Sequence, residues 1–128
     1  MRHGLTPLAC VDGFAVSGCA PGVMRLGPIE ASRKAMKRAG VTMNDIDLVE
    51  MNEAFAAQAE ACRRALDIDP VKLNVDGGAI ALGHPLGATG TRLVGKAATL
   101  LRREGKRRAL ATQCIGGGMG IAMILEAA

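Results

Sequence analysis

The sequence has almost no aromatic residues: it has no Tyr, no Trp and only two Phe, Phe14 and Phe55. Proteins that bind single-stranded nucleic acid usually stack the bases on aromatic rings, so this scarcity argues against that function. The net charge of +4 is mild and suits a small anionic ligand. The basic tracts lie at an expected helix end, where they complement the helix dipole. We therefore expect no nucleic-acid partner.

Features typical of zinc, secreted and membrane proteins are also missing. The four cysteines show no C-x-x-C spacing, so we expect no zinc ribbon and no metal site. The uncharged stretch 109–125 is shorter than the roughly 20 residues that a membrane span requires, so we expect no membrane partner. The first residues do not resemble a secretory signal, and we expect a cytoplasmic protein with reduced thiols.

Glycine, in contrast, is abundant. The chain has 17 glycines, and eleven of them lie between Gly77 and Gly120. Glycine inside a helix costs about 1 kcal/mol, so this enrichment argues against a helical bundle. It favours a backbone that turns sharply or approaches a ligand closely. The length of 128 residues is that of one domain, which we expect to span residues 1–128.

The hydrophobic pattern predicts an α/β domain. Strands are expected at residues 8–16, 46–51, 71–75, 107–113 and 119–126, and helices at residues 29–39, 54–66 and from the glycine-rich loop to about residue 104. The order βαβαβαββ predicts a mixed, mainly parallel five-stranded sheet with helices on both faces. Only a few residues separate the last two strands, which predicts an antiparallel hairpin. The first strand is apolar on both faces, and we expect it to be largely buried.

Polar side chains follow three of these strands or their loops: Asn52, His84 and Cys114. Ligands of open α/β sheets collect at the carboxyl ends of the strands, so we expect these residues to form one site. Asn52 admits two interpretations. It is either the N-cap of the next helix or an amide that orients a water or a substrate.

His84 and Cys114 also admit more than one interpretation. His84 lies between glycines and before Pro85, a rigid frame that suits a catalytic base or an oxyanion donor; otherwise it is a surface histidine held by a backbone bond. Cys114 precedes Ile115 and three glycines, whose amides could bind an anion. Its thiol is either activated, as a thiolate or proton relay, or a small buried hydrophobe.

The remaining cysteines have a structural interpretation. Cys62 lies on the apolar stripe of its predicted helix, which is typical of a buried structural residue. We expect the same of Cys10 and Cys19.

Three motifs in order give the chain a resemblance to a known family. They are N-E-A-F-A at 52–56, G-G-A-I-A-L-G-H-P-L-G at 77–87 and C-I-G-G-G at 114–118. With the flanking segments at 27–35 and 45–50, the chain resembles the C-terminal domain of the thiolases, which include acetyl-CoA acetyltransferase and 3-ketoacyl-CoA thiolase. The resemblance extends from about Leu5 to Glu126.

The resemblance implies roles for the motif residues. His84 would be the base that activates a nucleophilic cysteine, and would donate to the thioester oxygen together with a water held by Asn52. Cys114 would exchange a proton with the substrate α-carbon. The backbone amide of Gly116 would help to bind the oxyanion.

The resemblance also points to the acyl pocket and to two departures from the family pattern. Phe55 and Met24 are similar to residues that line the acyl pocket of the family. Arg25 and Leu26 replace the glycine-led pattern M-G-x-G-P, so a large cation lies beside this pocket. Asp76 replaces the usual Asn before the glycine-rich loop.

The family resemblance implies an acyltransferase of fatty acid metabolism that acts on acyl-CoA and coenzyme A, by thiolysis or Claisen condensation, with no separate cofactor. The family nucleophile belongs to an N-terminal domain, so we expect the chain to be inactive alone and to need a complementary half. Full-length members are expected to form homo-oligomers. The chain is then a fragment, a split subunit or a truncated gene product. The alternatives are a non-catalytic interaction or dimerisation module and, on charge alone, a nucleic-acid binder.

Overall fold

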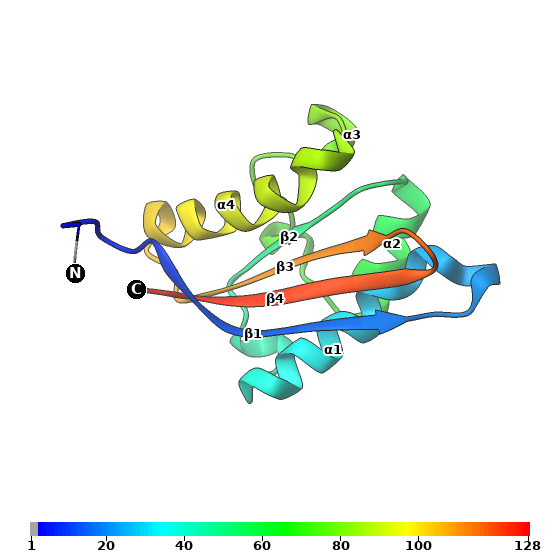
Figure 1. Ribbon diagram of the computed structural model, residues 1–128, viewed down its shortest axis with the longest axis horizontal. Coiled ribbons are helices and arrows are strands. Elements are labelled where there is room, and N and C mark those ends of the chain that lie inside the picture. Colours follow the sequence, from blue (N-terminus) through cyan, green and yellow to red (C-terminus); the bar gives the residue numbers. More distant parts are fainter. Residues whose placement is uncertain (1–2) are drawn as a thin grey trace.

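A computed structural model describes residues 3–128, with the exception of the Met24 side chain. The centre of the fold is a four-stranded sheet whose strands follow the spatial order β1-β4-β3-β2. The strands are β1 (Ala9–Gly18), β2 (Leu48–Met51), β3 (Arg108–Ile115) and β4 (Met119–Ala127). β4 pairs antiparallel with both β1 and β3, and β2 pairs parallel with β3 (Figure 1). The predicted C-terminal hairpin is confirmed.

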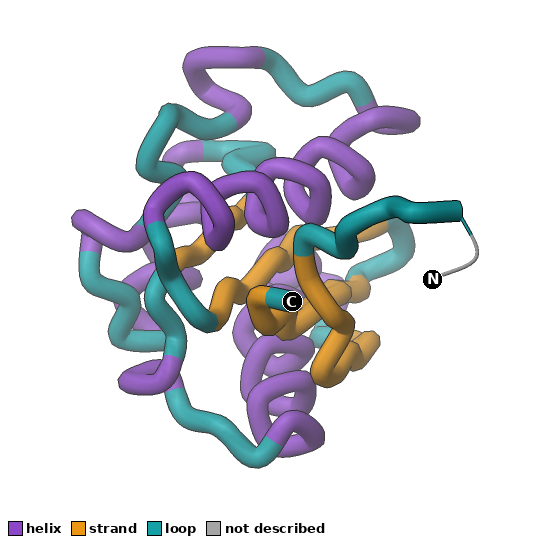
Figure 2. The backbone as a smooth tube through the Cα atoms, turned by 90° about the vertical axis from the view of Figure 1, so that its left-hand side faces the viewer, coloured by secondary structure: helices purple, strands orange, loops and turns teal. Residues whose placement is uncertain are grey.

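Helices cover both faces of the sheet, as the sequence predicts (Figures 1 and 2). The helices are α1 (Gly27–Ala39), α2 (Ala56–Ala65), α3 (Ala79–Leu82) and α4 (Leu86–Glu104), and the 3-10 turns are η1 (Pro21–Leu26), η2 (Met43–Asp45) and η3 (Pro70–Lys72). α1 and α4 end at Gly40 and Gly105, whose positive φ angles of 68° and 60° suit glycine. Within residues 3–128, no helix is long and apolar enough to cross a membrane.

The prediction of five mainly parallel strands is wrong, because two of the three strand pairs are antiparallel. Residues 71–75 do not form the expected strand. Pro70 starts the turn η3, in which the Asp69 side chain accepts a hydrogen bond from the Val71 amide. Only Leu73 then reaches the sheet, through a single bridge to Val49. The side-chain cap and the proline thus favour a turn over a strand that apolar content alone predicts.

The first strand is also more exposed than expected. β1 is an edge strand that pairs with β4 alone, and α1 covers only one of its faces. The side chains on the opposite face are exposed: Val11 by 57%, Phe14 by 56% and Val16 by 47%. The prediction of a largely buried strand is therefore wrong for this face.

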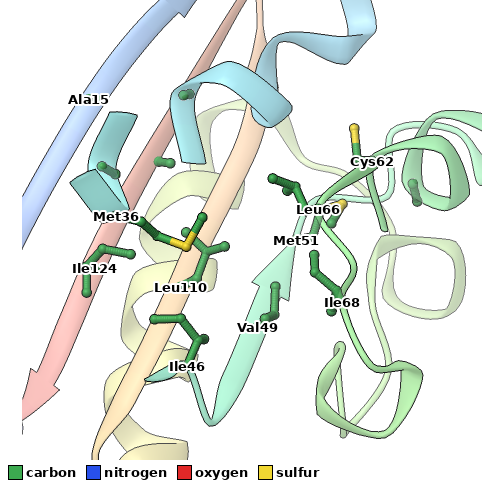
Figure 3. Packing of buried hydrophobic residues seen from close by; sticks show 14 residues of the cluster. Ala15, Met36, Ile46, Val49, Met51, Cys62, Leu66, Ile68, Leu110 and Ile124 are labelled. Atoms are coloured by element: carbon green, nitrogen blue, oxygen red, sulfur yellow. The ribbon is translucent and has the colours of Figure 1, made fainter. Parts of the chain in front are cut away.

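The face under α1 and α2 holds the main core (Figure 3). The largest of its labelled side chains are Met36, Ile46, Val49, Met51, Leu66, Ile68, Leu110 and Ile124. α1 lies directly on the sheet because Gly27 and Gly120 meet backbone to backbone; a Cβ on either would overlap the other. This contact also fixes the position of η1, which immediately precedes Gly27.

The opposite face, under α4, holds a smaller core. Its buried members are Leu48, Ala97, Leu100, Leu101, Ala109 and Leu125. α4 packs on β2, β3 and β4. Near its first turns, a cavity of about 150 Å³ remains between Gly90, Leu93 and the strands β3 and β4. This face of the sheet is therefore incompletely covered.

Candidate functional site

The parallel strands β2 and β3 bring two of the predicted site residues to one edge of the sheet. Asn52 directly follows β2, and Cys114 is the second-to-last residue of β3. His84 lies in the loop between α3 and α4, at the same end of the sheet (Figure 1). The expectation that strand ends assemble these groups agrees with the contacts described below.

Asn52 and His84 are in direct contact. The Asn52 side chain is fully buried, and its Nδ2 lies 3.3 Å from His84 Nε2. The N-cap interpretation of Asn52 is wrong, because α2 begins at Ala56 and its N-cap is Phe55. A buried amide that faces a ring nitrogen fits the alternative interpretation, in which it orients a polar group.

The second ring nitrogen of His84 is held by Thr89. Nδ1 lies 2.7 Å from Thr89 Oγ1, and that hydroxyl donates its proton to the carbonyl oxygen of Pro85 at 3.0 Å. A hydroxyl has only one proton, so when Thr89 donates it to Pro85, the ring donates to Thr89 through Nδ1–H. In the neutral ring, Nε2 then carries the lone pair and accepts from the Asn52 amide. This tautomer suits a base that acts through Nε2.

Glu53 and Asn74 join the loop after β2 to the glycine-rich loop. The Asn74 side chain accepts from Met51 N and donates to Met51 O, both at 2.9 Å, and also donates to Glu53 Oε1 at 2.8 Å. Glu53 Oε2 accepts from the amide of Ile80, in the first turn of α3, at 3.0 Å. Gly78 allows this approach, since a Cβ there would overlap the Glu53 carboxylate. These bonds fix the spacing between Asn52 and His84.

Sequence reasoning missed these supporting residues. Thr89 carries a usable signal, because a hydroxyl four residues after Pro85 can reach back to the proline carbonyl within the first helical turn. Asn74 gives no such signal, since its role depends on a left-handed backbone with φ of 46°. Glu53 lies in the N-E-A-F-A motif, but its bonds to Asn74 and Ile80 join segments that are distant in the sequence.

Cys114 is half-buried, and its strand position pairs it with Gly120. Burial raises the pKa of the Cys114 thiol, and the nearby positive charge of Arg25 opposes this rise without cancelling it. The thiol is therefore protonated at neutral pH. This result favours a proton donor over the activated thiolate considered from the sequence.

The other cysteines divide between two outcomes. Cys62 is fully buried in the core, as expected, and burial raises its pKa. Cys10 is exposed, so its prediction as a buried residue is wrong; it lies on the edge strand β1. Cys19 is half-buried and its Sγ donates to the carbonyl oxygen of Gly118 at 3.2 Å.

A groove at this edge of the sheet brings His84, Cys114, Phe55 and Gly116 to one surface, whereas Asn52 is fully buried. Its lining consists of Arg25, Ala54, Phe55, His84, Leu86, Gln113, Cys114, Ile115 and Gly116. The Phe55 ring is 53% exposed, and the Arg25 guanidinium lies 3.4 Å above its centre. The Met24 side chain lies outside the described part of the chain. Asp76, the second departure from the family pattern, forms an ion pair with Arg103 at 2.8 Å.

A buried carboxylate lies two residues before Asn52. Glu50 points toward α4, and its Oε1 lies 3.5 Å from Lys96 Nζ. Both carboxylate oxygens are buried without a hydrogen-bond partner among the described residues. Burial raises the pKa of Glu50 to about 7, and the charges of Lys96 and Arg92 oppose this rise. Within residues 3–128, no cluster of His, Cys, Asp and Glu could hold a metal ion.

Comparison with known proteins agrees with the resemblance seen in the motifs. The family described as "Thiolase, C-terminal domain" matches residues 5–127. The human mitochondrial 3-ketoacyl-CoA thiolase is 52% identical over 125 residues, which are 98% of this chain and 32% of that protein. The acetyl-CoA acetyltransferase of Paracoccus denitrificans is 53% identical over the same shares.

Solved structures give the same result for the fold. The crystal structure of human mitochondrial 3-ketoacyl-CoA thiolase in complex with CoA superposes with a TM-score of 0.96 at 51% identity, and covers 99% of this chain and 32% of that one. The Bacillus anthracis acetyl-CoA acetyltransferase has a TM-score of 0.95 at 42% identity, with the same coverage. The chain thus spans about a third of the length of the curated relatives it matches. Across nearly its full length it belongs to the thiolase family, as the C-terminal domain of that fold.

Proposed function

We propose that this chain supplies the C-terminal half of a thiolase active site, which transfers an acyl group between acyl-CoA and coenzyme A. The observation that carries the proposal is that His84, held by the buried side chains of Asn52 and Thr89, lines one groove together with Cys114. The similarity to a thiolase solved in complex with CoA supports coenzyme A as the thiol carrier. The reaction then needs no separate cofactor.

In this proposal, His84 acts as the base through Nε2. A nucleophilic cysteine from the complementary half transfers its thiol proton to this nitrogen, and the thiolate attacks the thioester carbonyl. The carbonyl electron pair moves to the oxygen, and its return expels the leaving thiolate. The protonated Nε2 can then donate to the oxyanion together with a water held by Asn52. Thr89 keeps the ring in the orientation that this exchange requires.

Cys114 acts as the second acid and base. During thiolysis, the nucleophilic thiolate adds instead to the 3-keto carbonyl of the substrate, and the acyl group stays on that cysteine as the carbon–carbon bond breaks. The Cys114 thiol gives its proton to the α-carbon that leaves, and its raised pKa suits this donor role. During condensation, the thiolate form removes the same proton. The backbone amide of Gly116 is proposed to bind the oxyanion of the acyl-enzyme. Phe55 and Met24 are proposed to line the acyl pocket.

The complementary half is the proposed partner. Relatives are about three times as long as this chain, and the chain leaves the β1 side of the sheet uncovered. The exposed side chains Val11, Phe14 and Val16 form an apolar strip, which a second domain would remove from water. Homo-oligomers of the assembled enzyme, a cytoplasmic location and a role in fatty acid metabolism complete the proposal.

The test is to combine the chain with a polypeptide equivalent to the remaining two thirds of a relative. We expect no turnover of acetoacetyl-CoA by the chain alone and measurable thiolysis by the pair. His84→Ala and Cys114→Ala should each reduce kcat by about 10²-fold or more. His3→Ala, which changes an exposed histidine in no motif, is the matched control. Turnover by the free chain, or full activity in either site variant, would contradict the proposed roles.

The exposed strip also supports a second candidate, a non-catalytic interaction module in which two copies of the chain cover each other. Size-exclusion chromatography of the free chain separates the two proposals. A stable dimer that excludes the complementary half favours the module, and a monomer that binds this half favours the enzyme.

A further inference from the structure

Arg25 is a cation without a counter-charge beside the proposed reacting groups. Within residues 3–128, its guanidinium forms no hydrogen bond with a protein group and no ion pair. It lines the groove that holds His84 and Cys114, and also a second, mainly apolar hollow bounded by Pro21, Val23, Leu26 and Gln58. None of the described residues that line these two hollows is acidic. The chain therefore places an unneutralised positive charge between them.

The position of this charge is determined by packing. Arg25 lies in the last turn of η1, and the backbone contact of Gly27 with Gly120 fixes the end of this turn against β4. The face of the guanidinium rests on the Phe55 ring, 3.4 Å above its centre. Because stacking uses the face of the group, the N–H donors at its edge stay available. An edge of this kind matches a carboxylate with two parallel hydrogen bonds.

We propose that Arg25 selects acyl groups that end in a carboxylate, so that the preferred substrates are thioesters of short dicarboxylic acids. The proposal rests on the proposed function, which places the thioester carbonyl between His84 and Cys114. From there an acyl tail that extends along Phe55 brings its end to Arg25. Coenzyme A phosphates do not fit this position, because the long pantetheine arm holds them far from the thioester.

The charge also bears on Cys114. The positive charge of Arg25 opposes the rise in the pKa of the Cys114 thiol that burial causes, and a bound carboxylate would neutralise this opposition. A carboxylated substrate would thus keep the thiol protonated, as the donor role in thiolysis requires. Substrate recognition and the protonation of Cys114 support each other in this arrangement.

The test measures binding to the 128-residue chain by NMR titration. The two probes are succinyl- and butyryl-N-acetylcysteamine thioesters, which have the same chain length, differ in the terminal carboxylate and lack phosphates. We expect the succinyl probe to bind about fivefold more tightly than the butyryl probe at low salt, and this preference should be smaller at high salt. Binding should change the chemical shifts of Arg25 Nε–Hε and of the Phe55 ring. Arg25→Met should remove the preference and Arg25→Lys should retain part of it. Arg102→Met, at the far end of α4, is the matched control.

Equal affinity for the two probes, no binding of either, or an unchanged preference in Arg25→Met would overturn the proposal. Free coenzyme A forms a separate arm. If its affinity falls in Arg25→Met while the two probes bind alike, Arg25 recognises phosphate, and selection of the acyl tail is refuted. The measurement involves no turnover, so it is independent of the His84 and Cys114 variants. A charge preference without acyl transfer would contradict only the proposed function, and transfer without the preference would contradict only this inference.

Discussion

The two faces of the sheet are built from the same strands but differ in how they are closed. Under α1 and α2, apolar side chains from β1 to β2 form one continuous core, and the hydroxyls within it are paired: Ser32 donates to Thr112, which donates to Ile121 O. Under α4, the apolar core is smaller and borders the buried carboxylate of Glu50, which lies 3.5 Å from Lys96 Nζ but accepts no hydrogen bond from a described residue. Farther along this face, Phe14 and its neighbours on β1 are exposed.

This difference separates stability from function. A face closed by its own helices contributes most of the hydrophobic stabilisation of the domain. The face under α4 leaves apolar surface exposed and buries the carboxylate of Glu50, both of which cost free energy. The proposed complementary half would cover the exposed apolar part of this face. The following predictions test this division, in order of expected effect.

The largest effect is expected in the closed core. Leu110 is fully buried on β3, and Leu110→Ala should lower the free energy of unfolding by about 2–5 kcal/mol, since it removes apolar contacts and leaves a cavity. Urea denaturation followed by circular dichroism measures this change. Leu5→Ala, the same substitution at an exposed position, is the control and should change stability by about 0.5 kcal/mol or less. Similar losses of unfolding free energy in both variants would contradict the assignment of most hydrophobic stabilisation to the closed core.

The next effect concerns Glu50 and depends on pH. Its pKa is about 7 in the folded chain and near 4.5 when unfolded, so the folded state binds the extra proton between these values. The contribution of Glu50 to stability is therefore favourable below about pH 4.5 and is lost as the pH rises to 7. The shift corresponds to about 3–4 kcal/mol.

Glu50→Gln should remove most of this fall in stability between pH 5 and pH 8. Urea midpoints at the two pH values, for the parent chain and the variant, measure the difference. Glu104→Gln, which changes an exposed carboxylate at the end of α4, should leave the fall intact. If the parent chain is equally stable at both pH values, Glu50 is ionised at both and its pKa is not raised by burial. Glu50 would then not distinguish the face under α4 from the closed face.

The smallest effect on stability is expected on the open strip. Phe14→Ser should change the free energy of unfolding by about 1 kcal/mol or less, because the ring is more than half exposed. The same change should weaken binding of the complementary half by about tenfold or more, since a central aromatic anchor is lost. Titration calorimetry measures the binding. Val71→Ser, at an exposed apolar position on η3, should affect neither quantity; unchanged binding in Phe14→Ser would refute the assigned role of the strip.

The limits of sequence reasoning are visible at particular elements. The helices and the C-terminal hairpin follow from local periodicity and from glycine stops, which act within a few residues. The prediction of a strand at residues 71–75 is wrong because Pro70 and the hydrogen bond to the Asp69 side chain favour a turn there, although the segment is apolar. The prediction that β1 is largely buried is wrong because an edge position depends on the order of strands in space. Periodicity has no information on that order.

The candidate site likewise has some features set by local sequence and others set by the tertiary structure. The sequence alone singled out the groups proposed to carry the chemistry, because the motifs around Asn52, His84 and Cys114 are local and their glycine and proline neighbours restrict the backbone directly. Only the tertiary structure decided the surroundings of each group. The contact of His84 Nε2 with Asn52, the raised pKa of Cys114 and the free charge of Arg25 each depend on residues that the fold brings together from distant segments. Distance and burial set these properties, and neither is encoded in the spacing of residues along the chain.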